Sequence, residues 1–181
     1  MAKSGNCEPL SRPDKWYVGA GNRLTWTPPH PQWLDAPGFW DEAHYYDRAL
    51  APVFTVTLLT EDGTHLPLQA ADRHWRPDRL RQTYEVPNAP LSVVEKKTAH
   101  PCDVLASTFT IRNEADEPET VHLIAWTLQP TASSTPPDGL ATLTPQKDSV
   151  RFRRALPADG RSAYDLGCAF GMNAPLTSHS A

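Results

Sequence analysis

Prolines interrupt this chain so often that short strands are favoured over helices. Nineteen of its 181 residues are proline. Inside a helix, each proline removes a backbone donor and collides with the preceding turn. Between the prolines, β-branched and apolar residues form short runs bounded by turn-forming residues, a pattern typical of β-strands. The spacing therefore predicts an all-β protein.

The clearest hairpin lies near residue 60. β-Branched and apolar residues fill 53–59, and the run ends at Glu61-Asp62-Gly63-Thr64. The glycine supplies a position where a positive φ costs little. The chain is expected to return through 65–68 as the second strand of the hairpin.

The strongest single strand pattern covers residues 104–112. Leu105, Phe109 and Ile111 fall on one face of this run, and the expected partner strand, 121–128, follows an acidic turn at 113–119. Such short connections favour antiparallel pairing, because parallel strands need crossovers of about a dozen residues. We therefore predict an antiparallel two-sheet β-sandwich. Other expected strands are 80–86, 91–98, 150–154 and 163–171.

Length limits these strands to one domain. A chain of 181 residues can bury one sizeable core but not two complete ones. Residues 1–15 are polar and broken by two prolines, so a flexible tail is expected there. Residues 16–181 are expected to form a single sandwich domain, incomplete or the N-terminal part of a longer protein, with a loop at 129–140.

Charge and motif content argue against several classes of function. The net charge of −4 gives no field that attracts nucleic acid or an acidic membrane surface. No apolar run approaches the roughly 20 residues that span a bilayer, and no secretory signal follows the N-terminus. Three cysteines without metal spacing favour reduced thiols and a cytoplasmic location. With no phosphate loop, nucleophile motif or histidine pair, no cofactor, metal or catalytic residue is predicted.

The segment 26–46 is the candidate binding region. It holds six of the sixteen aromatic side chains, four prolines and three acidic residues, without a helix or strand period, which predicts a long irregular segment. Flat aromatic faces beside carboxylates can hold a sugar ring, because the C–H face stacks while the hydroxyls donate to the acids. The candidate substrate-binding residues are Trp26, Trp33, Trp40, Asp41, Tyr45 and Tyr46.

Two alternative roles remain open for these residues. The rings could anchor the segment by burial against a sheet or another domain. Asp41 could instead cap a short helix within 41–50.

The stretch from about residue 19 to 128 resembles a known family. The resembling pieces are Ala20-Gly-Asn-Arg-Leu-Thr-Trp26, the hairpin near residue 60, Leu91-Ser-Val-Val-Glu-Lys-Lys-Thr98, and Asp103 to Asn113 followed by acidic residues and Val121 to Trp126. This succession is similar to the N-terminal β-supersandwich, of the galactose mutarotase-like type, of bacterial six-hairpin glycosidases with an (α/α)6 barrel. The resemblance implies a non-catalytic domain that supports carbohydrate processing by a following helical-barrel domain.

Two other functions are retained. The chain could be a stand-alone carbohydrate-binding module that uses its aromatic residues. It could also be a mutarotase-like sugar epimerase with a histidine and glutamate as acid and base. Only His100 with Glu95, or His74 with Glu85, could be nominated for that chemistry.

Overall fold

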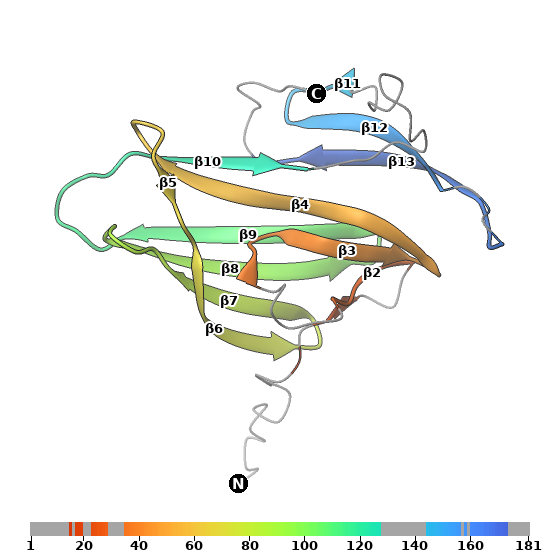
Figure 1. The fold of residues 1–181 in the computed structure, drawn as a ribbon, viewed down its shortest axis with the longest axis horizontal. Coiled ribbons are helices and arrows are strands. Elements are labelled where there is room, and N and C mark those ends of the chain that lie inside the picture. The colour runs from red at the N-terminus through yellow and green to blue at the C-terminus, as the bar shows by residue number, and fades with distance from the viewer. Residues whose placement is uncertain are drawn as a thin grey trace, which may run out of the picture. The chain divides into compact units, whose positions relative to one another are not determined.

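The computed structural model describes residues 15, 17–19, 23–28, 35–127, 144–156, 158 and 160–173. The secondary structure of these residues consists of β-strands, which confirms the all-β prediction (Figure 1). The chain divides into two compact units, Met1–Trp126 and Thr127–Ala181. Residues 1–14 of the expected tail and the expected loop 129–140 lie outside the described residues, and the single-domain assignment of 16–181 stays a prediction.

The first sheet of the Met1–Trp126 unit has six strands. Its order is β1-β2-β3-β4-β10, and β5 also pairs with β4. All of its pairings are antiparallel. The strands are β1 Val18–Gly19, β2 Leu24–Trp26, β3 Phe39–Tyr45, β4 Arg48–Thr60, β5 His65–Leu66 and β10 Val121–Trp126.

The second sheet of this unit is a four-stranded antiparallel meander. Its order, β6-β7-β8-β9, follows the order of the chain. Short connections suffice because each strand pairs with the next one. The strands are β6 Gln69–Arg76, β7 Arg79–Glu85, β8 Leu91–His100 and β9 Val104–Asn113.

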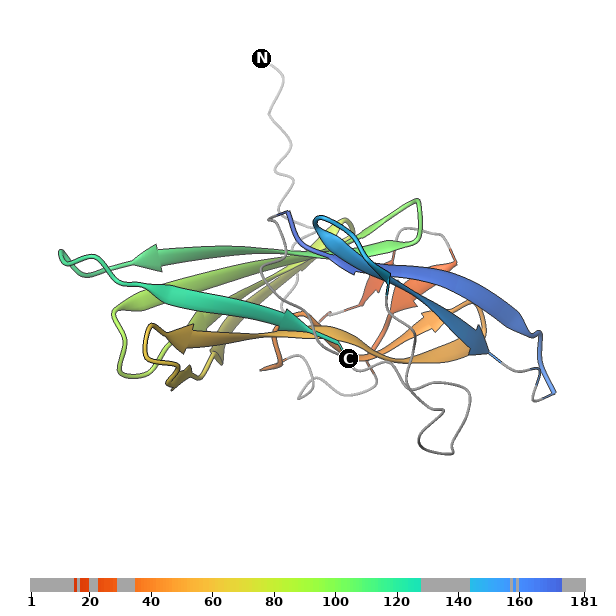
Figure 2. The same cartoon turned by 90° about the horizontal axis from the view of Figure 1, so that it is seen from above.

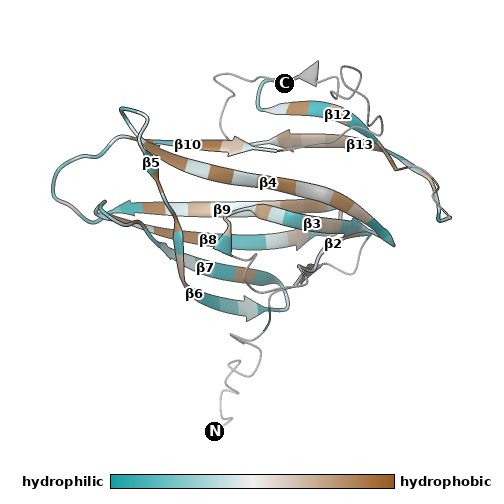
Figure 3. Ribbon diagram, viewed as in Figure 1, coloured by the Kyte–Doolittle hydropathy of each residue, from teal (hydrophilic) through white to brown (hydrophobic). Residues whose placement is uncertain are grey.

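Two clusters of buried apolar side chains lie between the two sheets. Seen from above, gold β4 and teal β10 lie in one layer and green β8 and β9 in the other (Figure 2). One buried cluster joins Trp26 and Phe39 of the first sheet to Leu80 of the second, and another joins Leu58 to Val93. In the second half of β4, from Phe54 to Leu58, apolar residues alternate with threonine (Figure 3), as expected for a stretch with one buried face. The predicted two-sheet sandwich is confirmed.

The predicted hairpin near residue 60 is present. β4 and β5 pair through Leu58 with Leu66 and Leu59 with His65. Gly63 has a φ of 85°, in the left-handed region where glycine is favoured. The Asp62 carboxylate accepts hydrogen bonds from the Thr60 hydroxyl and from the Thr64 N–H, which closes the turn.

The predicted pairing of 104–112 with 121–128 is wrong. β9 pairs with β8, whereas β10 pairs with β4 in the other sheet, from Val121 opposite Thr60 to Trp126 opposite Thr55. The acidic segment between them therefore crosses from one layer to the other instead of turning a hairpin. A strand with one apolar face can pair in either sheet of a sandwich, so alternation alone does not select the partner.

Part of the aromatic segment is more regular than expected. Residues 39–45 form β3, and β4 begins at Arg48, so the short helix considered within 41–50 is wrong. The register between β3 and β4 shifts twice, between Phe39 and Glu42 and between Glu42 and His44. Such irregularities break the two-residue alternation, which hid this strand in the sequence.

The Thr127–Ala181 unit contains one three-stranded antiparallel sheet. Its strands are β11 Thr144–Pro145, β12 Ser149–Leu156 and β13 Tyr164–Gly171, in that order. β12 and β13 pair along their full length, from Ser149 opposite Gly171 to Leu156 opposite Tyr164. The strands predicted at 150–154 and 163–171 are confirmed. In the described part of the chain, no helix is long and apolar enough to cross a membrane.

Candidate functional site

Trp26 lies in the sandwich core. Its side chain has no exposed surface, and its ring meets Phe39 edge to face at 5.2 Å. The Lys97 ammonium lies 4.8 Å from the centre of the same ring. In this structure the ring has no open face for a ligand and instead anchors β2 to the interior. Trp33, another candidate residue, lies outside the described residues.

Trp40 meets a tryptophan that the sequence did not nominate. The ring centres of Trp40 and Trp126 are 4.8 Å apart and their planes are inclined by 61°. Trp126 is 42% exposed, among the most exposed large apolar side chains of the described residues, and Trp40 is partly exposed. The indole N–H of Trp126 donates to the Thr57 hydroxyl at 3.0 Å. An aromatic face is therefore held in a fixed orientation at the protein surface.

The strand alternation explains why these side chains point outward. Val121 and Leu123 of β10 pack against the core, so the alternate residues Ile124 and Trp126 face away from it. In the register of β10 with β4, Ile124 lies opposite Thr57. Trp40 follows the fully buried Phe39 and projects to the same outer side, where it contacts Trp126. We call Trp40, Thr57, Ile124 and Trp126 the tryptophan surface.

Tyr45 and Tyr46 occupy a different place, at the other end of β3. Their rings are 5.1 Å apart, and the Arg23 guanidinium lies 5.7 Å from the Tyr45 ring centre. Arg23 also pairs with Asp103, whose carboxylate raises the pKa of the guanidinium through a hydrogen bond. Five residues of extended strand, about 16 Å, separate Trp40 from Tyr45. The structure does not bring all the nominated aromatic residues into one site.

The nominated Asp41 is partly buried in β3, within the first register shift, between Phe39 and Glu42. Its position one residue after Trp40 puts it beside the tryptophan surface in the chain. Successive residues of a regular strand point to opposite faces, but a bulge relaxes that rule. The structure therefore leaves a role for Asp41 in ligand contact as a prediction.

A buried polar cluster lies between the two sheets. Both Glu95 and Lys97 of β8 have no exposed surface. The Glu95 carboxylate accepts hydrogen bonds from the Gly38 N–H at 2.8 Å, the Tyr84 hydroxyl at 2.6 Å and the Ser107 hydroxyl at 2.5 Å. The Lys97 ammonium lies 3.7 Å from the same carboxylate and donates to the Ala36 carbonyl at 3.1 Å. These contacts tie the segment before β3 to three strands of the second sheet.

Burial controls the ionisation of this cluster. It lowers the pKa of Lys97, and the nearby Glu95 carboxylate opposes that shift. It also raises the pKa of Tyr84, and the Glu95 carboxylate adds to that increase. Because the cluster is sealed from solvent, we interpret it as structural.

The two histidine–glutamate pairs considered for epimerase chemistry find other partners. Glu95 accepts hydrogen bonds from Gly38, Tyr84 and Ser107, and His100 lies about 16 Å further along β8. The His74 ring nitrogen is 3.2 Å from the Asp72 carboxylate, on its own strand.

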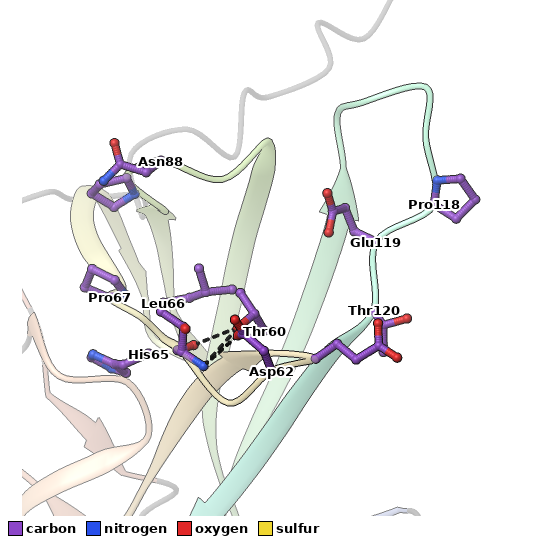
Figure 4. A pocket seen from close by; sticks show the side chains of 12 residues that line it. Thr60, Asp62, His65, Leu66, Pro67, Asn88, Pro118, Glu119 and Thr120 are labelled. Atoms are coloured by element: carbon purple, nitrogen blue, oxygen red, sulfur yellow. Dashed lines mark hydrogen bonds between the residues drawn. The ribbon is translucent and has the colours of Figure 1, made fainter.

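A hollow of about 520 Å³ opens where turns of the first unit gather (Figure 4). The β4–β5 turn supplies Asp62, the β7–β8 turn supplies Asn88, and the segment before β10 supplies Glu119. The hydrogen bond from the Thr60 hydroxyl holds the Asp62 carboxylate within its own turn, and it also lowers the pKa of Asp62. Within the described residues, no group of histidine, cysteine, aspartate or glutamate is arranged to hold a metal ion. Leu66 and three prolines line the hollow together with polar side chains, and no phenylalanine, tyrosine or tryptophan is among its lining residues.

The tryptophan surface is therefore the best candidate for a binding site. Aromatic rings with an exposed face contribute large contact area at low entropic cost. Trp126 was the residue that sequence reasoning missed, although the alternation of Val121, Leu123 and Ala125 already indicates that it points outward. Neither the protein-family models nor the curated proteins match this chain.

Proposed function

We propose that the Met1–Trp126 sandwich is a non-catalytic domain that binds carbohydrate through the tryptophan surface. The observation that carries this proposal is the contact of Trp40 with Trp126 on the outer side of the six-stranded sheet. Exposed indole rings suit the apolar C–H faces of sugar rings. The neighbouring Thr57 hydroxyl keeps one of the two rings in place.

The burial of the Glu95 carboxylate supports the proposed absence of catalysis. Glu95 has no exposed surface and accepts three hydrogen bonds, so it cannot reach a substrate as it stands. Incubation of the chain with aryl glycosides, and polarimetry on freshly dissolved glucose or galactose, should show no turnover. Clear turnover in either assay, retained after repurification, would contradict the non-catalytic assignment.

The binding proposal is tested by calorimetric titration with a panel of oligosaccharides. We expect at least one to bind, and Trp126→Ala to weaken its affinity at least tenfold, or about 1.4 kcal/mol. Tyr17→Ala is the matched control, because Tyr17 is 45% exposed but packs on Trp75 of the other sheet. A panel without any binding, or equal losses in both variants, would refute the proposal.

A second function is favoured by the exposed aliphatic residue within the same surface. Ile124 is 46% exposed, and aliphatic side chains are more typical of protein contacts than of sugar contacts. The resemblance described above implies a following helical-barrel domain as the partner. In that case Ile124→Ser should weaken association with such a domain as much as Trp126→Ala does. A sugar site should respond mainly to Trp126→Ala.

A further inference from the structure

The geometry of the tryptophan surface also points to the physical form of its ligand. We propose that it binds a single soluble chain of a neutral glycan, and not the flat face of a crystalline polysaccharide. This inference rests on the proposed carbohydrate function. It depends on three observations: the inclination of the two rings, the hydrogen bond that holds one of them, and the lack of lysine and arginine in the outward row of β10 and the β4 residues opposite it.

The inclination of the rings excludes a common contact plane. The planes of Trp40 and Trp126 meet at 61°, so they cannot both lie flat on one planar surface. With ring centres 4.8 Å apart, the two rings touch and form a corner. A sugar unit can stack on one ring while its edge meets the other. A free chain can turn its units to fit such a corner, whereas the units of a crystal face are fixed in one plane.

The orientation of Trp126 is fixed before any ligand arrives. Its indole N–H donates to Thr57 at 3.0 Å, and Thr57 belongs to the neighbouring strand β4. A ring held in this way loses little rotational freedom on binding, which favours affinity. It also resists rotation into the plane of Trp40, so the corner is expected to persist when a ligand binds.

The β10 side of the corner offers no cation to an acidic ligand, which favours a neutral one. His122, Ile124 and Trp126 form the outward row of β10, and they lie opposite Leu59, Thr57 and Thr55 of β4. None of these six side chains carries a carboxylate, ammonium or guanidinium group. An acidic glycan would find no lysine or arginine among them to pair with its carboxylates or sulfates.

The test compares ligand forms with the full chain. Calorimetry measures binding to soluble neutral hexasaccharides of glucose, xylose and mannose and to hexagalacturonate, and a pull-down measures retention on crystalline cellulose. We expect a neutral soluble chain to bind, with hexagalacturonate at least tenfold weaker and no retention on the crystalline solid. Trp126→Ala should reduce the neutral affinity at least tenfold, whereas Tyr17→Ala, whose exposed ring packs on Trp75 away from the tryptophan surface, should change it less than threefold.

Thr57→Val provides the sharper variant, because it removes the acceptor of the indole hydrogen bond and keeps the ring. We expect it to weaken binding of the neutral chain by three- to tenfold while the melting temperature stays close to that of the parent. Retention on crystalline cellulose without soluble binding, or preference for hexagalacturonate, would overturn this inference but leave carbohydrate binding intact. Absence of binding to every ligand would instead overturn the proposed function.

Discussion

At the scale of single residues, the most unusual feature is an ion pair enclosed by the sandwich. Burial of two charges costs several kcal/mol each, so such a pair persists only with further hydrogen bonds. Glu95 receives these from Gly38, Tyr84 and Ser107, and Lys97 donates to Ala36 and lies over the Trp26 ring. The pair thereby fixes where the segment before β3 meets the second sheet.

A double-mutant cycle tests the coupling of this pair. Glu95→Gln leaves a buried ammonium without its carboxylate, and Lys97→Met leaves the carboxylate without its cation, so each should cost about 3 kcal/mol or more. The double variant removes both charges and should cost at least 1 kcal/mol less than the sum. Urea unfolding of the four proteins measures these differences. Strictly additive losses would show that the two charges do not interact.

The raised pKa of Tyr84 predicts a loss of stability in alkali. Up to about pH 10 this tyrosine is protonated in both the folded and the unfolded chain. Above that pH the unfolded chain ionises while the buried phenol does not, so the free energy of unfolding falls by up to about 1.4 kcal/mol per pH unit. Tyr84→Phe lacks this contribution and should lose stability less steeply between pH 9.5 and 11.

The lowered pKa of Lys97 has the opposite effect on stability, because it makes the free energy of unfolding increase as the pH rises. Its pKa is lowered on folding, so its contribution to stability rises as the pH increases toward its unfolded value near 10.4. The lysine is present in both the parent and Tyr84→Phe, so its effect largely cancels in the comparison. Equal slopes for the two proteins in urea unfolding at each pH would rule out the assigned role of Tyr84.

At the scale of elements, the entry into β3 depends on one glycine. Gly38 has a φ of 74°, and a Cβ added there would lie 2.6 Å from the Phe54 carbonyl oxygen and 3.0 Å from the Thr55 Cα. Gly38→Ala should therefore combine left-handed strain with a backbone clash and cost about 3 kcal/mol. The same change would also disturb the N–H that donates to Glu95.

Gly63→Ala is the matched control for this prediction. Gly63 has a φ of 85°, but no atom of the described chain lies within 4 Å of an added Cβ. Strain alone should cost about 1 kcal/mol. Thermal unfolding of both variants separates the two effects. Similar melting temperatures would mean that the close approach of Gly38 to β4 does not matter.

The elements predicted correctly are those whose determinants lie within a few residues. The β4–β5 hairpin follows from a β-branched run and a glycine turn, and β8 follows from alternation that begins at Leu91 and Val93. The sequence did not predict β6, whose eight residues include five polar or charged ones, or β3, whose register with β4 is irregular. Glu95 and Lys97 continue the inward row of β8, although polar residues are normally assigned to the solvent face.

At the scale of the whole molecule, both tryptophans of the candidate site belong to the Met1–Trp126 unit. A fragment ending at Trp126 retains both sheets of the sandwich and every member of the tryptophan surface. We therefore expect it to show a β-type circular dichroism spectrum, to unfold cooperatively and to bind the same oligosaccharide within twofold of the full chain's affinity. An unfolded fragment would show that the Thr127–Ala181 unit is required for the sandwich to form.

The sequence by itself determined the all-β class, most strands and the β4–β5 hairpin, because proline spacing, alternation and turn residues act over short distances. Only the tertiary structure decided that β10 joins β4 instead of β9, which brings Trp126 to Trp40. It also decided that Trp26 is buried while Trp40 is partly exposed. The choice of sheet and face depends on contacts between residues far apart in the chain, and local patterns do not encode them.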